Sequence, residues 1–350
     1  MKTVTVDASR RYQVLIGANL LEECANYISQ IKKTCTVAII SDSNVFPLYG
    51  TIVSESLQNA GYQVHSYVFS AGEASKTPET YLNILQFLAN IHLTRSDLIL
   101  ALGGGVVGDI AGFAAATYLR GTDYIQIPTS LLAMVDSSVG GKTAIDLPEG
   151  KNLVGAFYQP ILVICDVMAL STLPEPVFTD GCAEVIKYGV LYDESLFAHL
   201  ASFGKKFSRE DVIARCVELK RNVVAEDEFD TGARQKLNLG HTVGHAIEKN
   251  SNFSITHGRA VAMGMGVITN AGVSLGLCAE DVYQKLVSTL SSFDLPYATN
   301  MNAQDLFDAA LSDKKRSGGN VNLVIPERIG HCILLKTPIT QLKSLLESGL

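Results

Sequence analysis

The chain has 350 residues, of which 47% are hydrophobic and 18% are charged, and its formal net charge at pH 7 is −7. This length fits two domains of ordinary size, and the composition excludes a disordered or fibrous chain. The acidic balance argues against a protein that binds nucleic acid or a membrane surface, so we expect neither partner. An anionic ligand would have to be met by local lysines and arginines.

Up to about residue 170, β-rich runs alternate with helical stretches, after an N-terminus that resembles a pair of strands. The β-rich runs cover residues 36–42, 62–70, 97–104, 123–129 and 161–166. Thr77 and Pro78 are typical of a helix start between the second and third of these runs. This order of elements predicts a parallel α/β sheet that is covered on both faces.

After residue 174 the β-branched runs mostly stop and long helical patterns follow. These patterns cover residues 177–191, 209–229, 235–250, 259–277 and 279–293. Residues 320–336 form one late exception, which reads as a hairpin. We therefore expect a Rossmann-like parallel-sheet domain over residues 1–174 and a mainly α-helical domain over residues 175–350.

The seven cysteines are dispersed and have no C-x-x-C spacing. An odd number of scattered cysteines is typical of reduced, buried thiols rather than of a disulfide framework. The N-terminus lacks the continuous apolar stretch of a signal peptide, and no 18-residue apolar run occurs. We expect a cytoplasmic protein.

The stretch "LALGGGVVGD" joins a predicted buried strand to a helix of small residues. Gly103, Gly105 and Gly108 match the pattern G-x-G-x-x-G, and their position between strand and helix favours a dinucleotide pyrophosphate at the helix N-terminus. The acidic residue that would bind a ribose, Asp42, lies upstream rather than about 20 residues downstream, so the arrangement is a variant of the Rossmann plan. The alternative is that the glycines only permit tight packing.

His241 and His245 in "LNLGHTVGHAIE" stand four residues apart and so share one helix face. The pattern lacks the glutamate of H-E-x-x-H, which excludes that class of zinc protease. His257 follows, and Glu184 lies on an earlier helix. Two imidazoles and a carboxylate leave positions open for a substrate oxygen, as a catalytic Zn²⁺ requires. The alternative is a hydrogen-bonded pair of core histidines.

Several cations lie among small residues, where an ordinary solvated face would carry more charge. They are Lys142, Lys151, Lys187, Lys220, Arg221, Arg234, Lys314 and Lys315. If they converge, they would suit a phosphorylated acid. The alternative is that each is a surface charge.

Five motifs resemble those of the 3-dehydroquinate synthase family, within the sugar phosphate cyclases, in order and spacing over nearly the whole chain. They are "GGGVVGD", "IPTSLLAMVDSSVGGKTAID", "GKNLVGAFYQP", "AEVIKYG" and "LNLGHTVGHAIE". The resemblance implies a lyase of the shikimate pathway that depends on NAD and on a divalent metal, Zn or Co. Such an enzyme converts 3-deoxy-D-arabino-heptulosonate 7-phosphate into 3-dehydroquinate and phosphate by transient oxidation, phosphate elimination, reduction, ring opening and aldol closure.

The resemblance also implies a role for individual residues. It places the metal ligands at Glu184, His241 and His257. It places the NAD site at Asp42, Gly72, Glu73, Lys76, Gly104, Gly105, Val106, Gly108, Asp109, Thr129, Ser130, Lys142, Lys151 and Thr172. It places the substrate contacts at Arg120, Asp136, Lys142, Asn152, Lys187, Lys220, Arg234, Asn238, His245, Lys314 and Lys315. It assigns catalytic roles to His245, Lys142, Asn152 and Glu184, with His245 relaying a proton at the metal-bound hydroxyl.

Arg120 matches an arginine that, in the family, reaches the active site of the neighbouring subunit, so the resemblance implies a homodimer. The chain departs from the family pattern at Arg259, which stands where a glutamate is usual, and at Cys182, where a larger apolar residue is common. Neither change removes a ligand, although Arg259 reverses a charge two residues from His257 and puts the surroundings of the metal in doubt.

Three alternatives share some of these features. A metal-dependent polyol dehydrogenase would use the same loop and metal site but no phosphate-binding lysines. Other sugar phosphate cyclases would differ in a few pocket residues. A non-enzymatic dinucleotide sensor would not need open metal positions. Net NADH release would identify the dehydrogenase, and absence of turnover would identify the sensor.

Overall fold

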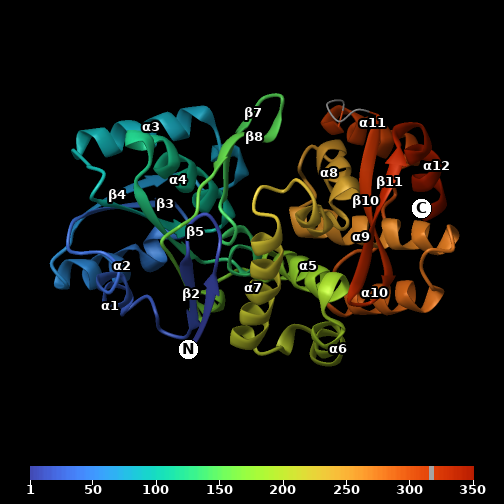
Figure 1. The fold of residues 1–350 in the computed structure, drawn as a ribbon, viewed down its shortest axis with the longest axis horizontal. Helices are drawn as coiled ribbons and strands as arrows, with labels where there is room; N and C mark the ends of the chain where they lie inside the picture. Colours follow the sequence, from blue (N-terminus) through green and yellow to red (C-terminus); the bar gives the residue numbers. More distant parts are fainter. Residues whose placement is uncertain (315–318) are drawn as a thin grey trace. The chain divides into compact units, whose positions relative to one another are not determined.

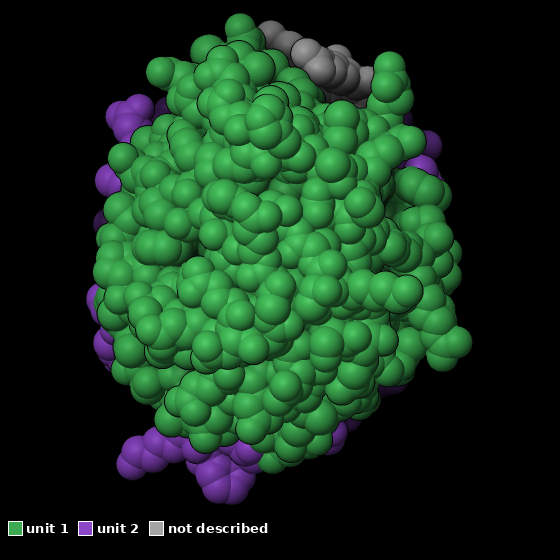
Figure 2. Space-filling model, turned by 90° about the vertical axis from the view of Figure 1, so that its left-hand side faces the viewer, with its two compact units in different colours: residues 1–174, 209–229 green, residues 175–208, 230–350 purple. Residues whose placement is uncertain are grey.

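The structure is a computed structural model of the chain, and it describes residues 1–314 and 319–350. These residues form two compact units, which are coloured in Figure 2. Unit 1 comprises residues 1–174 and 209–229, and unit 2 comprises residues 175–208 and 230–350.

A seven-stranded sheet forms the centre of unit 1, in the order β1-β2-β9-β6-β5-β3-β4. Its strands are β1 (Lys2–Val6), β2 (Tyr12–Gly17), β3 (Thr36–Asp42), β4 (Gln63–Phe69), β5 (Leu98–Gly103), β6 (Asp123–Pro128) and β9 (Leu162–Asp166). All neighbours pair in parallel except β1 and β2, which form an antiparallel ribbon at one edge. The five β-rich runs of the sequence are thereby confirmed as strands.

Burial along the strands follows from their place in the sheet. Every residue of the central strand β5 is buried, as expected where helices cover both faces, whereas the edge strand β4 is mostly half-buried or exposed. The helices of this unit are α1 (Cys24–Ser29), α2 (Phe46–Asn59), α3 (Pro78–Asn90), α4 (Gly105–Thr117) and α7 (Arg209–Glu226). In Figure 1, α3 and α4 lie on one side of β3, β4 and β5, and α1 and α2 lie on the other.

Unit 1 confirms one local prediction and contains one hairpin that was not predicted. Thr77 caps α3, because its side chain accepts a hydrogen bond from the backbone N–H of Thr80. A second, antiparallel hairpin made of β7 (Lys142–Leu147) and β8 (Gly150–Phe157) is absent from the sequence analysis. Both strands carry glycines or charged residues, and β8 is largely exposed. The hairpin therefore lacks the apolar alternation that indicates a strand.

Helix α7 belongs to unit 1 although the chain has already entered unit 2, and the sequence analysis places residues 209–229 in the second domain. The helix packs on β1 and β2. Its first turn pairs with the N-terminal residues, since Asp211 contacts Lys2 and Glu210 lies 3.3 Å from the terminal ammonium group. These partners lie more than 200 residues away in sequence, which is why no local pattern indicates this return of the chain.

Unit 2 is mainly helical, as expected. Its helices are α5 (Glu175–Tyr192), α6 (Glu194–Phe203), α8 (His241–Asn250), α9 (His257–Ser274), α10 (Glu280–Ser292), α11 (Ala303–Lys314) and α12 (Ile339–Gly349). Helix α9 is buried along most of its length and is packed against α5, α8, α10 and α12. The expected late hairpin is present as β10 (Asn320–Arg328) paired with β11 (His331–Pro338). Within the described ranges, no helix has the length and hydropathy that a bilayer-spanning segment requires.

The Asp97 carboxylate ties together the starts of two neighbouring strands of the unit 1 sheet. It accepts hydrogen bonds from the backbone N–H of Thr36 at 2.9 Å and from the N–H and Oγ1 of Thr94 at 2.7 and 2.6 Å. Burial raises the pKa of Asp97, but these hydrogen bonds outweigh it and hold the pKa below its ordinary value.

We expect Asp97→Asn to lower the free energy of unfolding by about 1.5–3 kcal/mol, because hydrogen bonds to a charged acceptor are lost. A lowered folded-state pKa stabilises the protein at pH values above the unfolded-state pKa of about 4, and this contribution is lost as the pH falls further through the folded pKa. Urea unfolding from pH 7 down to pH 3 measures both effects. The exposed Asp7→Asn variant is the control, and equal stability of the two variants at pH 7 would contradict the assignment.

Candidate active site

Three helices of unit 2 bring Glu184, His241 and His257 together. Glu184 lies in the middle of α5 and is 2% exposed, while His241 and His257 are the first residues of α8 and α9. Potential ligand atoms of the three side chains lie within 4.8 Å of one another. The residues that the family resemblance implies as metal ligands therefore converge in the structure, although they are far apart in sequence.

Both imidazole rings turn the same nitrogen toward Glu184. Nε2 of His241 and Nε2 of His257 each lie 3.5 Å from Oε1 of Glu184. Ligands bound at about 2.0–2.2 Å to a tetrahedral metal lie about 3.3–3.6 Å apart, so this spacing suits a single small cation.

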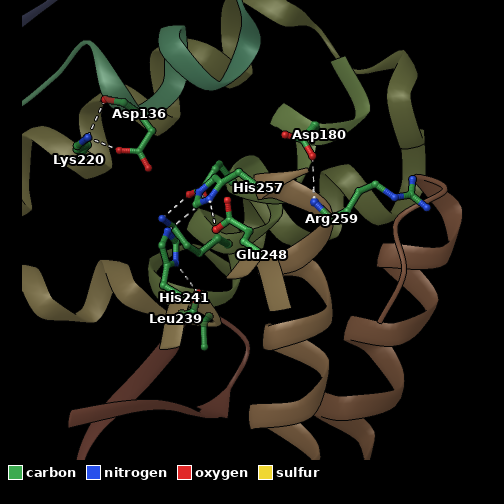
Figure 3. A network of polar contacts seen from close by, with 10 residues as sticks. Asp136, Asp180, Lys220, Leu239, His241, Glu248, His257 and Arg259 are labelled. Atoms are coloured by element: carbon green, nitrogen blue, oxygen red, sulfur yellow. Dashed lines mark hydrogen bonds and ion pairs between the residues drawn. The ribbon is translucent and has the colours of Figure 1, made fainter. Parts of the chain in front are cut away.

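The other ring nitrogen of each histidine faces an oxygen that can accept a hydrogen bond but cannot donate one. Nδ1 of His241 lies 3.1 Å from the carbonyl oxygen of Leu239, and Nδ1 of His257 lies 3.3 Å from Oε2 of Glu248 (Figure 3). Each Nδ1 therefore donates a hydrogen, and when a ring is neutral its Nε2 lone pair is directed at the Glu184 carboxylate. With both rings neutral, three electron-rich atoms face one another, and a cation between them removes the repulsion, so the residues fit a divalent metal such as zinc.

The two histidines differ in their electrostatic surroundings. Burial lowers the pKa of His241 to about 3, and the nearby Lys187 ammonium contributes to the decrease. Burial also lowers the pKa of His257, but hydrogen bonds to Glu184 and Glu248 outweigh it and raise the pKa to about 10. The two carboxylates thus create a negative potential at His257 that attracts a proton or, in its place, a metal ion.

Lys187 lies one helical turn after Glu184 on α5 and is 1% exposed. Its Nζ contacts Oε2 of Glu184, the carboxylate oxygen that does not face the histidines. A buried ammonium is costly unless it is paired, and this contact supplies a partner. Lys187 therefore orients the Glu184 carboxylate in the structure, in addition to the substrate contact that the resemblance implies.

In unit 1, the residues implied as the NAD site lie where the parallel strands end. Asp42 is the last residue of β3, Gly104 follows β5, and Thr129 follows β6. The chain continues from β3 to β4 on one side and from β5 to β6 on the other, so the strand order reverses between β3 and β5. Ligands of open α/β sheets bind at this kind of switch point.

A buried lysine connects three segments at this edge of the sheet. Nζ of Lys76 donates to Oδ2 of Asp109 at 2.6 Å and to Oδ1 of Asn152 at 2.5 Å. Nearby, Lys151 forms an ion pair with Glu73 at 3.5 Å. The structure thus brings five of the predicted residues, from the turn after β4, from α4 and from β8, into three neighbouring contacts.

The glycines of the loop before α4 play different parts. A Cβ at Gly108 would lie 2.6 Å from Oε1 of Gln126 on β6, so a larger residue here would require the end of that side chain to shift. A Cβ at Gly104 would meet only Ser130 Oγ, at the ordinary contact distance of 3.5 Å. The packing alternative therefore has direct support at Gly108, whereas the chain itself leaves space beside Gly104.

Lys220 and Asp136 form a further contact within unit 1 (Figure 3). Nζ of Lys220, on α7, donates to the carbonyl oxygen of Asp136 at 2.7 Å and also contacts its carboxylate. Asp136 lies in a π-helical turn over Ala133–Ser137 against which α7 packs. The return of α7 to unit 1 is thus what brings these two implied substrate contacts together.

The remaining predicted residues are distributed over both units. Arg120, Lys142 and Asn238 are exposed, His245 is exposed on α8, and Arg234 is buried in a 3₁₀ turn over Ala233–Asn238. Thr172 contacts the hydroxyl of Tyr49, and Asp42 accepts hydrogen bonds from the N–H groups of Asn44 and Val45. The side chain of Lys314 and the whole of Lys315 lie outside the described residues.

Two site residues are missing from the sequence analysis. Glu248 holds His257, and its place three residues after His245 in "HTVGHAIE" is a signal that could have identified it. Asp180, four residues before Glu184 on α5, accepts hydrogen bonds from Thr256 and from the backbone N–H of Arg259. Spacing of four residues on a helix places Asp180 and Glu184 on the same face.

The Arg259 side chain is directed away from the metal ligands (Figure 3). The side chain extends away from His257 (Figure 3), and its Nη1 lies 3.4 Å from the carbonyl oxygen of Asp294. The carboxylate that faces His257 comes from α8 instead, through Glu248. The doubt that the departure at residue 259 raises is therefore answered by the geometry.

Comparison with known proteins identifies the same family as the sequence motifs. A family model described as 3-dehydroquinate synthase N-terminal matches residues 66–180, and one described as 3-dehydroquinate synthase C-terminal matches residues 181–316. The chain is 43% identical over 343 residues to the 3-dehydroquinate synthase of Clostridium acetobutylicum, covering 96% of each chain. It is 44% identical over 346 residues to that of Clostridium botulinum, covering 97% of this chain and 99% of the relative.

Among solved structures, the chain resembles a 2-deoxy-scyllo-inosose synthase that is complexed with carbaglucose-6-phosphate, NAD⁺ and Co²⁺. The TM-score is 0.90, the sequence identity is 27%, and all of each chain is covered. The Rossmann-like and helical architecture expected from the sequence is therefore confirmed.

The N-terminus of α9 is capped from another helix. The side chain of its own N-cap residue, Thr256, makes no capping hydrogen bond. The cap comes from Asp180, whose carboxylate accepts the N–H of Arg259 at 3.0 Å. We expect Asp180→Ala to lower the free energy of unfolding by about 0.5–2 kcal/mol, and Asp180→Asn to retain most of it, since asparagine caps nearly as well. Urea unfolding measures the difference, and an alanine variant as stable as the wild type would contradict it.

Proposed function

The chain belongs to the 3-dehydroquinate synthase family, and we propose that it converts 3-deoxy-D-arabino-heptulosonate 7-phosphate into 3-dehydroquinate and phosphate. The observation that carries this proposal is the convergence of Glu184, His241 and His257, with the lone pairs of both histidines directed at one carboxylate. That set leaves room for substrate oxygens beside the three protein ligands, which a purely structural metal site does not.

We assign the cofactors to sites within each unit. In unit 2, Glu184, His241 and His257 would hold Zn²⁺ or Co²⁺; in unit 1, the carboxyl ends of β3, β5 and β6 would hold NAD. When bound, NAD supplies reversible hydride transfer and the metal supplies Lewis acidity at the substrate hydroxyls. The N–H groups of the first turn of α4 would bind the pyrophosphate beside Gly104.

The chain's own residues supply the remaining steps. His245 is exposed on the α8 face that also bears His241, and we assign it the proton transfer at the substrate hydroxyl. Lys142 and Asn152, on the two strands of the β7–β8 hairpin, would contact substrate in unit 1 together with Asp136 and Lys220. The set is completed by Lys187, Arg234 and Asn238 in unit 2 and by Lys314 and Lys315, and the cations among all of these suit a phosphate and a carboxylate.

The reaction predicts that NAD is regenerated in every turnover. With NAD⁺ at about one hundredth of the substrate concentration, phosphate release should exceed the NAD⁺ present many-fold, without accumulation of NADH absorbance. Phosphate assay, absorbance at the NADH band and identification of the product test this directly. Stoichiometric NADH without phosphate would instead indicate a polyol dehydrogenase, and absence of turnover would favour a dinucleotide sensor.

The Gly104→Val variant tests where NAD binds. The chain leaves space at this position, so the variant should keep the thermal stability of the wild type. Its side chain would occupy the approach to the α4 N-terminus and should weaken NAD binding at least roughly tenfold, or 1.4 kcal/mol. Unchanged NAD affinity would show that the cofactor does not bind at this loop.

We further propose a homodimer in which Arg120 serves the active site of the partner subunit. Leu119 and Arg120 have φ angles of 51° and 66°, and Gly121 follows with 121°. Two successive non-glycine residues in the left-handed region are costly, and strained segments of this kind cluster at functional sites. Both side chains are exposed, as a contact with a second subunit requires.

Subunit mixing tests this assignment. The Arg120→Ala and His245→Ala homodimers should each be nearly inactive. Co-expressed in equal amounts, they should regain about a quarter of wild-type activity, because half of the dimers have one intact site. The two variants purified separately and assayed one by one are the control. No recovery on co-expression would place Arg120 in the site of its own subunit.

We also propose a cytoplasmic location. All seven cysteines lie in the described residues and are free thiols, and six of them are buried. Reduced, buried thiols are typical of a reducing compartment.

We propose a small-molecule phosphorylated sugar acid as the ligand partner, rather than nucleic acid or a membrane.

A further inference from the structure

Helix α8 carries three polar side chains on one face. His241, His245 and Glu248 stand at relative positions 0, 4 and 7, which corresponds to two turns of an α-helix. Glu248 is 3% exposed and lies in the last turn of the helix. A buried carboxylate at a helix C-terminus is disfavoured both by desolvation and by the helix dipole, so it requires a compensating partner.

That partner is the metal ligand His257. Oε2 of Glu248 lies 3.3 Å from Nδ1 of His257, while Nε2 of the same ring lies 3.5 Å from Glu184 (Figure 3). The backbone of Glu248 also shapes the turn that leads to His257. Its carbonyl oxygen accepts hydrogen bonds from the N–H of Phe253 at 2.8 Å and from Oγ of Ser251 at 2.9 Å.

We propose that Glu248 is the positioning residue that fixes the tautomer and ring orientation of His257 for metal binding. This inference rests on the proposed metal site. The carboxylate accepts the Nδ1 hydrogen, so the Nε2 lone pair faces the position between His241 and Glu184 where the cation binds. His241 receives the same support from a neutral acceptor, the carbonyl of Leu239. Glu248 supplies a full negative charge, which makes the ligating nitrogen of His257 a stronger donor to the metal.

A different role for the same carboxylate is ligation of a second ion. Ligand atoms of His245, Glu248 and His257 also lie within 4.8 Å of one another. The hydrogen bond between Glu248 and Nδ1 of His257 favours the positioning role, because that nitrogen already carries a proton and cannot ligate. The number of ions bound per chain separates the two roles.

The experiment measures Zn²⁺ affinity by competition with a chelator, and the visible spectrum of the Co²⁺-loaded protein, for wild type, Glu248→Ala and Glu248→Gln. We expect one ion per chain in all three. The Kd should rise about 10- to 100-fold in Glu248→Ala, with a changed Co²⁺ spectrum. Glu248→Gln should fall between the two, because its amide oxygen still accepts the Nδ1 hydrogen without the charge. The matched control is Glu327→Gln, which removes a carboxylate 3.2 Å from the exposed His331 and should leave both readouts unchanged.

Thermal unfolding of the metal-free proteins checks that the variants fold. If Glu248→Ala does not fold, the metal affinity and Co²⁺ spectrum of Glu248→Gln decide the outcome. Wild-type Kd and Co²⁺ spectrum in the folded variants would overturn the proposal. Two ions in the wild type and one in the variants would also overturn it in favour of ligation. A wild-type protein that binds no metal at all would refute the proposed function itself, which is a distinct result.

Discussion

The metal-binding unit depends on one electrostatic constraint, which is the convergence of three electron-rich atoms inside a helical core. Oε1 of Glu184 faces Nε2 of both His241 and His257, and in each ring the opposite nitrogen is committed to an outer acceptor. With both rings neutral and no cation between them this arrangement is repulsive, and a metal ion or a proton on His257 removes the repulsion.

Each of the three helices contributes to this in a different way. Helix α5 supplies Glu184 together with Lys187, which occupies the second carboxylate oxygen, and Asp180, which caps α9. A Cβ at Gly258, next to His257, would lie 1.9 Å from the carbonyl oxygen of Asp180, so α5 and α9 approach too closely here for any side chain. Helix α8 supplies His241 at its first residue and Glu248 at its last turn. The two histidine ligands therefore lie at helix starts, and the third ligand, Glu184, lies in the middle of α5.

In unit 1, the sheet brings loop residues together at one of its edges. Parallel pairing places the ends of β3, β5, β6 and β9 along the same edge, and the reversal of strand order separates the loops after β3 and β5. Lys76, Asp109 and Asn152 then link three of the connections. Because α7 packs on this unit, Lys220 meets Asp136 here although α7 is flanked in sequence by segments of unit 2.

The sequence by itself determined the strands of the parallel sheet, the helical second half, the late hairpin and the family. These features are encoded locally, in hydrophobic periodicity, in turn residues and in motifs such as "GGGVVGD" and "LNLGHTVGHAIE". It also named Glu184, His241 and His257, but only through the resemblance, since spacing alone left a core histidine pair as an alternative. Only the tertiary structure decided that α7 belongs to unit 1, that Gly108 faces the side chain of Gln126, and that Glu248 rather than residue 259 supports His257. These facts depend on contacts between segments brought together by folding, for which no short-range pattern carries a signal.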